Sequence, residues 1–233
     1  MLRVRNLVAR YGDFQALFGV DFDAAQGSIV ALIGANGAGK STFLRSIAGL
    51  MPSKDGEIRF HGDDIGALPV DEVVRRGVSM IPEGRRLFRS LTVEENLKVG
   101  AFAGRHGRWT LETVYALFPA LRERRTNSAT ALSGGQQQMV AIGRALMSNP
   151  DLLLCDELSL GLSPAVVKDI YAVLPRIRGE GVSIVVVEQD IDMALKAADE
   201  IYCFMHGRVT LRGPPRDFGH DAISAAYFGL EGR

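Results

Sequence analysis

The chain has 233 residues, with 27 Lys or Arg and 27 Asp or Glu, so its formal net charge at pH 7 is zero. That length supports one substantial core, alone or with an inserted lobe, and is short for two full domains. Balanced charge provides no overall field toward nucleic acid, and we expect no nucleic-acid partner. The sequence has no signal-peptide pattern and no run of about 18 apolar residues, which predicts that any membrane role comes through a partner. Cys155 and Cys203 lie in apolar runs, which predicts small buried side chains in a reducing compartment.

Strand-like patterns open the chain and then recur between helical stretches. Alternating apolar and polar residues at 4–10 and 20–24 predict half-buried antiparallel strands, joined by residues 58–60. Continuous apolar runs, typical of parallel strands buried on both faces, follow at residues 29–33, 78–81, 152–155 and 184–187. Helix-like segments such as residues 164–178 separate them, which is the α/β pattern. A late hairpin through His206-Gly207 is predicted from residues 201–211.

The middle of the chain has a different pattern. Between residues 83 and 131 the strand-like runs disappear, and helix-like segments at 93–101 and 113–121 replace them. This change predicts a helical lobe inserted into the α/β core.

Residues 34–41 read GANGAGKS and match the phosphate-loop (P-loop) pattern G-x-x-x-x-G-K-[ST]. A predicted strand precedes the loop and a predicted helix over 41–48 follows it, so a chance glycine-rich turn is the weaker interpretation. Glycines allow backbone N–H groups to face phosphate oxygens, Lys40 would reach the β- and γ-phosphates, and the Ser41 hydroxyl would bind Mg²⁺. The residues expected to contact the nucleotide are Gly34, Asn36, Gly37, Gly39, Lys40, Ser41 and Thr42.

Two further motifs carry chemistry. Residues 151–157, DLLLCDE, predict a buried strand that ends in Asp156, placed to hold Mg²⁺, and Glu157, placed to polarise the attacking water. A strand that merely ends in two acids is the alternative. Residues 132–136, LSGGQ, open a helix, and Ser133 with Gln136 fits a capping box. A cap alone does not explain the pair Gly134-Gly135, which favours close backbone approach to an anion.

These motifs, together with residues 159–162 (SLGL), stand in the order and spacing of ABC-transporter nucleotide-binding domains, which the chain resembles over nearly its whole length. The resemblance implies an α/β P-loop NTPase (RecA-like) core with an N-terminal antiparallel β-subdomain and an inserted α-helical subdomain. Within one domain of residues 1–233, residues 1–82 and 132–233 would form the core and residues 83–131 the helical subdomain. ATP and Mg²⁺ are the implied cofactors.

The same resemblance assigns nucleotide contacts that lie outside the P-loop. In this family the LSGGQ signature of one subunit caps the γ-phosphate held by the P-loop of another, which implies nucleotide contacts for Ser133, Gly134, Gly135 and Gln136. Tyr11 matches the aromatic residue that stacks on adenine, with a plain strand-end tyrosine as the alternative.

Three positions depart from the general family pattern. Glu83 stands where most members carry a glutamine that senses Mg²⁺ and the γ-phosphate, Gln189 replaces the switch histidine, and Leu158 replaces a frequent proline. We expect Glu83 to be a nucleotide and Mg²⁺ ligand, with an outward turn toward an arginine of the partner as the alternative. Gln189 is expected to hydrogen-bond phosphate without titrating near neutral pH. Together with residues 82–88, 91–97 and 226–229, the first two departures resemble the LivF branch, the ATPases of branched-chain amino-acid uptake. The similar urea-uptake ATPases fit the same residues.

The chain is therefore expected to hydrolyse ATP for a membrane importer, at the cytoplasmic face of the membrane. Implied partners are a second related ATPase, with a homodimer in isolation as the alternative, two permease subunits and, indirectly, a solute-binding protein. Residues 83–95 are expected to transmit the nucleotide state to the permease. A soluble ABC ATPase of DNA repair or translation is disfavoured because heptads and tandem cassettes are absent from the sequence. A regulatory module without turnover is disfavoured by the intact Lys40, Asp156 and Glu157.

Overall fold

The computed structural model describes residues 1–51 and 55–228. Contacts within the chain divide it into two compact units, one of Met1–Val70 with Ser183–Arg233 and one of Asp71–Val182. The expected family-like ending at residues 226–229 includes Gly229, which lies outside the described residues.

The first unit begins with an antiparallel sheet. Its strands are β1 (Leu2–Tyr11), β2 (Phe14–Ala24), β4 (Asp55–Phe60) and β5 (Asp63–Asp64), in the order β2-β1-β4-β5. The predicted strands at 4–10 and 20–24 are confirmed as one hairpin, in which Leu2 lies opposite Ala24 and Tyr11 opposite Phe14. Apolar residues of this sheet such as Val4, Phe22 and Ile58 are buried, as the alternating sequence pattern predicts.

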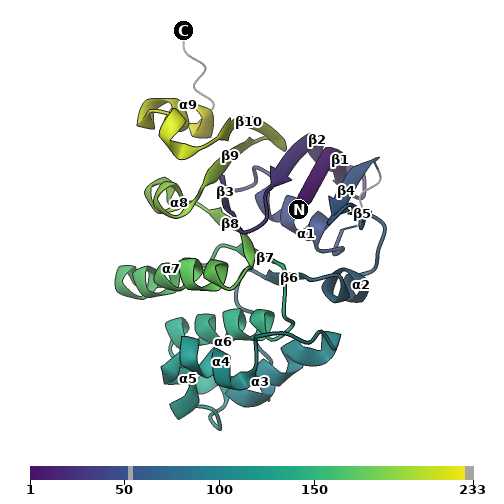
Figure 1. Cartoon of the computed structure of the whole chain (residues 1–233). Helices are drawn as coiled ribbons and strands as arrows, with labels where there is room; N and C mark the ends of the chain where they lie inside the picture. The colour runs from purple at the N-terminus through teal and green to yellow at the C-terminus, as the bar shows by residue number, and fades with distance from the viewer. Residues whose placement is uncertain (52–54, 229–233) are drawn as a thin grey trace. The chain divides into compact units, whose positions relative to one another are not determined.

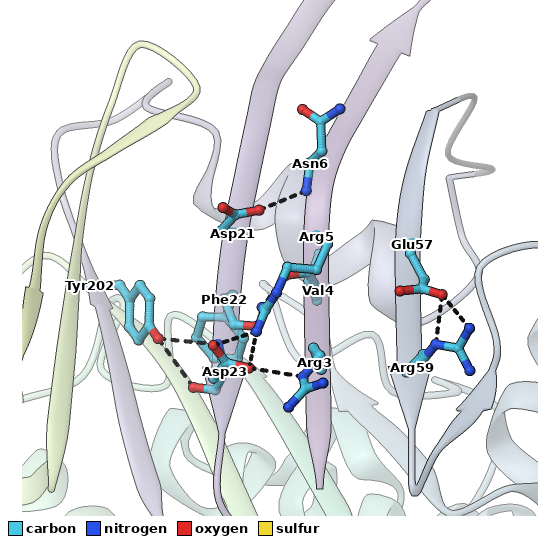
Figure 2. Close-up of polar contacts among 10 residues, drawn as sticks. All are labelled: Arg3, Val4, Arg5, Asn6, Asp21, Phe22, Asp23, Glu57, Arg59 and Tyr202. Atoms are coloured by element: carbon cyan, nitrogen blue, oxygen red, sulfur yellow. Dashed lines mark hydrogen bonds and ion pairs between the residues drawn. The ribbon is translucent and has the colours of Figure 1, made fainter.

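A polar cluster secures this sheet (Figure 2). The Arg5 guanidinium donates to both carboxylate oxygens of Asp23, at 2.8 and 3.0 Å. The Tyr202 hydroxyl accepts from the Asp23 N–H at 3.1 Å and donates to the Asp23 carbonyl at 3.3 Å. In the same hairpin, Asn6 has a φ of 49°, and its N–H donates to the Asp21 carboxylate at 2.7 Å where the register of β1 shifts. These bonds fix β1 and β2 to each other and to the strand that carries Tyr202.

The buried apolar runs of the first unit form parallel strands. The strands β3 (Ile29–Ile33), β8 (Ser183–Glu188) and β9 (Glu200–Met205) are parallel, and β10 (Arg208–Gly213) returns antiparallel to β9, which confirms the late hairpin. Helix α1 (Lys40–Ile47) packs against β1 and β2, α8 (Ile191–Ala197) against β3 and β8, and α9 (His220–Phe228) against β9 and β10 (Figure 1). All five residues of β3 are buried, as expected for a central parallel strand.

The second unit combines two parallel strands with helices. Strands β6 (Val78–Ile81) and β7 (Leu152–Asp156) pair in parallel, and helix α6 (Gly134–Leu146) contacts β6. Helix α6 also packs against helices to either side in the sequence, namely α3 (Val93–Gly100), α5 (Pro119–Glu123) and α7 (Pro164–Gly179). The remaining helices of this unit are α2 (Val70–Arg75) and α4 (Leu111–Leu117), with short 3-10 turns at Ala101–Ala103 and Ala129–Ala131.

One predicted helix is wrong in its extent. Residues 113–121 were expected to form a single helix, but α4 ends at Leu117 and α5 begins at Pro119. Phe118 between them has φ −128° and ψ 76°, because a residue before proline is driven out of the helical region by the proline ring. Pro119 then occupies the first helical position, where its missing N–H costs nothing.

Candidate functional site

The P-loop follows β3 in the first unit and has a backbone that glycine favours. Gly34, Gly37 and Gly39 have φ values of 147°, 79° and 104°. A Cβ on Gly34 would lie 2.2 Å from the carbonyl oxygen of Phe204, and one on Gly39 would lie 2.9 Å from a methyl of Leu17. Two of the three glycines are therefore required by space as well as by φ.

Lys40 is buried beneath this loop, with only 4% of its surface exposed. Its Nζ donates to the carbonyl oxygens of Gly34 at 2.6 Å and of Ala35 at 3.0 Å. A buried ammonium that binds the loop's own carbonyls helps to keep the loop open, and a phosphate would offer it stronger, charged acceptors. The phosphate contact of Lys40 stays a prediction.

The other predicted nucleotide contacts of this unit gather at the same helix start. Asn36 is exposed in the loop, Ser41 is half-buried in the first turn of α1, and Thr42 is buried. The Tyr11 hydroxyl lies 3.3 Å from the Thr42 hydroxyl, and 46% of the Tyr11 surface is exposed. The Tyr11 hydroxyl is thus held beside the P-loop helix while about half of the residue stays exposed, and the stacking role remains a prediction.

The β9–β10 turn supports the P-loop, a contact that sequence reasoning missed. The N–H of Gly207 donates to the carbonyl of Ala38 at 2.9 Å, and the Phe18 N–H donates to the Gly207 carbonyl at 3.0 Å. A Cβ on Gly207 would lie 2.2 Å from the carbonyl oxygen of Ala16. The glycine in the predicted hairpin was a signal of close backbone approach, although the sequence did not say to what.

Gln189 lies at the end of the strand beside the P-loop strand. Strands β3 and β8 pair in parallel with Ile33 opposite Glu188, so Gly34 and Gln189 leave the sheet at the same edge. The Gln189 side chain is exposed, whereas Glu188 is buried. Ligands of open α/β sheets bind at this carboxyl edge. The switch role of Gln189 stays a prediction.

The second unit places three acidic residues at one edge of β6 and β7. Ile81 pairs with Cys155, so Pro82-Glu83 and Asp156-Glu157 leave the two strands side by side. Asp156 is 1% exposed, Glu157 is half-buried with a left-handed φ of 54°, and Glu83 is exposed. A non-glycine residue held in this sparsely populated region is a common feature of active sites.

Leu158, the third departure from the general family pattern, is completely buried. A buried leucine contributes apolar burial where a proline would contribute rigidity, and it removes no reacting group.

The signature begins α6 with the predicted capping box. The Gln136 N–H donates to the Ser133 hydroxyl at 3.3 Å, and the Ser133 N–H donates to the Gln136 side-chain oxygen at 3.1 Å. The two glycines also have a packing reason, because a Cβ on Gly135 would lie 2.6 Å from Val166 and one on Gly134 would lie 3.4 Å from Arg85 and Leu162. The N–H groups of this helix start still form an anion-binding terminus.

The predicted Mg²⁺ ligands are hard oxygen donors. Ser41 offers a hydroxyl in the first turn of α1, Asp156 a buried carboxylate and Glu83 an exposed one. Mg²⁺ is commonly held by one or two carboxylates together with phosphate oxygens and water, so each of these side chains offers a type of donor that the ion accepts. Across residues 1–51 and 55–228, no three His, Cys, Asp or Glu side chains gather into a metal-binding group.

Comparison with known proteins decides the family. The sequence profile described as ABC transporter matches residues 17–159. The chain belongs to the ABC transporter family. It is 45% identical over 213 residues to the high-affinity branched-chain amino acid transport ATP-binding protein BraG of Pseudomonas aeruginosa, covering 91% of each chain. It is 36% identical over 216 residues to the probable branched-chain amino acid transport ATP-binding protein LivF of Archaeoglobus fulgidus, covering 91% of this chain and 92% of the relative.

Solved structures confirm the fold class. A nucleotide-free ATP-binding cassette of an ABC transporter matches with a TM-score of 0.82 at 28% identity, covering 97% of this chain and 94% of that one. A dimeric ATP-binding cassette bound to ADP and phosphate matches with a TM-score of 0.82 at 27% identity, covering 94% and 100%. The predicted P-loop NTPase fold is confirmed, and the chain is an ATP-binding, ATP-hydrolysing subunit of the ABC transporter type. Within the part of the chain that is described, no helix is long and apolar enough to cross a bilayer.

Proposed function

We propose that this subunit powers the import of branched-chain amino acids. The observation that carries the proposal is the 45% identity to BraG over 91% of both chains. The departures at Glu83 and Gln189 are consistent with the same branch, although the urea-uptake ATPases fit these two residues as well. The subunit would act at the cytoplasmic face of the membrane.

Each site residue has a role in this proposal. Lys40 would neutralise the β- and γ-phosphates, and Ser41 with Asp156 would hold Mg²⁺, which supplies charge stabilisation to the phosphates. Glu157 would orient the attacking water and accept hydrogen bonding from it, while Gln189 would donate its amide hydrogens to the γ-phosphate. Tyr11 would stack on adenine, and Asn36 and Thr42 would contact the phosphates. Glu83 would add an acidic ligand near Mg²⁺.

A second ATPase would complete each site. The Ser133–Gly135 helix start would face the γ-phosphate bound at the P-loop of its partner, so one chain would bind ATP but not turn it over efficiently alone. A related ATPase subunit is the proposed partner, with two permease subunits and a solute-binding protein acting further out. Residues 1–82 and 132–233 would form the nucleotide-binding core, and residues 83–131 the helical subdomain.

The permease would dock beside Glu83. A cavity of about 700 Å³ opens there, lined by Glu83, Arg85, Arg86, Arg89, Thr130 and Gln137 among others. Three guanidinium groups make this cavity basic, which suits an acidic segment of a permease. Glu83→Ala would then keep most ATP binding while uncoupling hydrolysis from transport.

Reconstitution with the membrane proteins that co-purify with the subunit tests the proposal. Vesicles containing the complex and its solute-binding protein should accumulate labelled leucine, isoleucine or valine when ATP is supplied on the side of the ATPase. Accumulation of urea instead would assign the related urea-uptake role, and ATPase activity without uptake of either solute would reject an import function.

A further inference from the structure

The backbone just after Glu83 forms an unusual left-handed turn. Gly84, Arg85 and Arg86 have φ values of 74°, 66° and 46°, so two consecutive non-glycine residues lie in the left-handed region. The Arg86 N–H donates to the Gly84 carbonyl at 2.7 Å, and the Arg85 N–H to the Pro82 carbonyl at 3.3 Å. Non-glycine residues persist in this region only where the surrounding structure holds them, so a specific contact must hold this turn.

Arg144 supplies that contact from helix α6. Its guanidinium donates to the carbonyl oxygens of Arg86 at 2.7 Å and of Arg85 at 2.9 Å, and it lies 5.5 Å from the centre of the Phe88 ring. Burial lowers the pKa of Arg144, yet a guanidinium in a protein stays charged. The planar fork therefore makes two charged hydrogen bonds to the two strained residues at once.

The other end of α6 touches the same turn. The Arg85 guanidinium lies 3.4 Å from the position of a Cβ on Gly134 and 3.4 Å from the Gln137 side-chain oxygen. It also reaches the Leu160 carbonyl at 3.5 Å, in the turn that follows Glu157. These contacts are long, but they bring the strained turn against the start of the signature helix and against the acidic strand end.

We propose that Arg144 is a positioning residue for ATP hydrolysis, which holds the turn after Glu83 in its left-handed form and ties it to the signature helix. A displacement at Glu83 then moves the turn, and the turn moves α6 through the two carbonyl bonds. Arg144 itself touches no nucleotide in this scheme. The inference rests on the proposed roles of Glu83 and the signature. The strained turn, and the two hydrogen bonds from Arg144 that hold it and are called the clamp below, do not depend on those roles.

Removal of the clamp should separate turnover from binding. In Arg144→Gln, kcat for ATP should fall by about tenfold, the usual consequence of losing hydrogen bonds to a charged donor. The affinity of the isolated subunit for a fluorescent ATP analogue should change by less than about twofold, because Lys40 and its loop are untouched. Arg144→Lys keeps the charge but not the forked geometry of the guanidinium, so its kcat should lie between those of the wild type and Arg144→Gln.

A glycine at position 86 should restore the kcat that Arg144→Gln loses, and this rescue is the decisive test. Since glycine adopts positive φ without penalty, Arg86→Gly should restore most of the lost kcat when combined with Arg144→Gln. His61→Gly is the matched control, because His61 also has a left-handed φ, of 50°, in the turn between β4 and β5. The control should stabilise its own turn but rescue no turnover.

A substitution that disfavours positive φ at residue 86 tests the proposal even if Arg144→Gln does not fold. Arg86→Val opposes the left-handed form while Arg144 is intact, so it should lower kcat, and His61→Val should not. Amide hydrogen exchange over residues 83–89 should rise in Arg144→Gln and Arg86→Val and return in the Arg144→Gln, Arg86→Gly double variant.

Unchanged exchange in the single variants, or no rescue by Arg86→Gly, overturns the clamp. If the wild-type complex itself hydrolyses ATP without transporting amino acids, the proposed import function fails while the exchange and rescue results still decide the clamp.

Discussion

Two regions of this protein, the P-loop and the edge of β6 and β7, have left-handed backbone, and they accommodate it in opposite ways. In the P-loop the positive φ values belong to Gly34, Gly37 and Gly39. At the edge of β6 and β7 they belong to Arg85, Arg86 and Glu157 as well as to Gly84. Glycine adopts such a conformation at no steric cost, whereas each non-glycine residue costs about 1–2 kcal/mol.

The P-loop therefore has an unstrained backbone, whereas the edge of β6 and β7 has a strained one. In the P-loop the glycines accept positive φ themselves, and the Phe204 carbonyl and a Leu17 methyl leave no room for a side chain at Gly34 and Gly39. The turn after Glu83 keeps its form because Arg144 holds it. A region held by contacts responds when those contacts change, which suits the part of an ATPase that reports the nucleotide state.

The largest expected effect breaks the P-loop side of this comparison. Gly34→Ala should destabilise the protein by roughly 2–6 kcal/mol and abolish ATP binding, because it combines backbone strain with overpacking against the Phe204 carbonyl. Gly37→Ala is the matched control: φ is 79°, but no atom lies within 4 Å of the added Cβ. It should cost only about 1–2 kcal/mol. Thermal unfolding and ATP titration measure both, and equal effects at the two positions would show that space plays no part.

Glu157→Gln tests the strained side through its chemistry. The amide keeps the size and backbone demands of the residue but cannot polarise water, so turnover should fall by about 10²–10⁴ while ATP binding survives. The variant should accumulate an ATP-bound dimer, with its partner subunit or with itself, visible by light scattering. Glu123→Gln, at an exposed glutamate of α5, is the control and should be active. Phosphate release by Glu157→Gln at the wild-type rate would remove Glu157 from the mechanism.

The strands and the P-loop were predictable because their signals are local. Uninterrupted apolar runs such as residues 29–33 can only be buried parallel strands or short core helices, and the glycine pattern after that run decides between them. The helix break at Phe118 was also visible in principle, because Pro119 follows it. Helix periodicity outweighed the proline in the prediction of residues 113–121, and that prediction was wrong.

The clamp was not predictable, for a physical reason. Arg144 looks like an ordinary charged residue near the end of a helix, and its partners are backbone carbonyls, which have no signature in the sequence. The sequence also gives no signal for the left-handed form of Arg85 and Arg86, since arginine has no preference for it. Contacts between distant segments that involve backbone atoms appear only once the chain is folded.

A smaller effect is expected from side chains that line the P-loop without shaping it. Tyr11→Ala should weaken nucleotide binding by about 1–3 kcal/mol, the range for a base stacked on an aromatic ring. Tyr11→Phe keeps the ring and loses only the contact of the hydroxyl with Thr42, so it should bind nearly as tightly as the wild type. Equilibrium binding of a fluorescent ATP analogue separates the two variants. If both lose affinity equally, the hydroxyl matters and the ring is only a strand residue.

The smallest effect on ATP turnover is expected at Gln189. This residue follows β8, the strand paired with the P-loop strand, and its own φ is not positive. Gln189→His should be tolerated, with ATP turnover within about threefold of the wild type, because either side chain can donate a hydrogen bond to phosphate. The imidazole adds one property that the amide lacks, because it titrates near pH 6.5. ATP turnover by the variant should therefore depend on pH between about 6 and 7 more strongly than turnover by the wild type. ATPase rates measured from about pH 5.5 to 8.5, which brackets the ordinary pKa of an imidazole, would show the difference. A well-folded Gln189→His protein without any activity would instead mean that the exposed amide makes a specific contact in the closed state that histidine cannot copy.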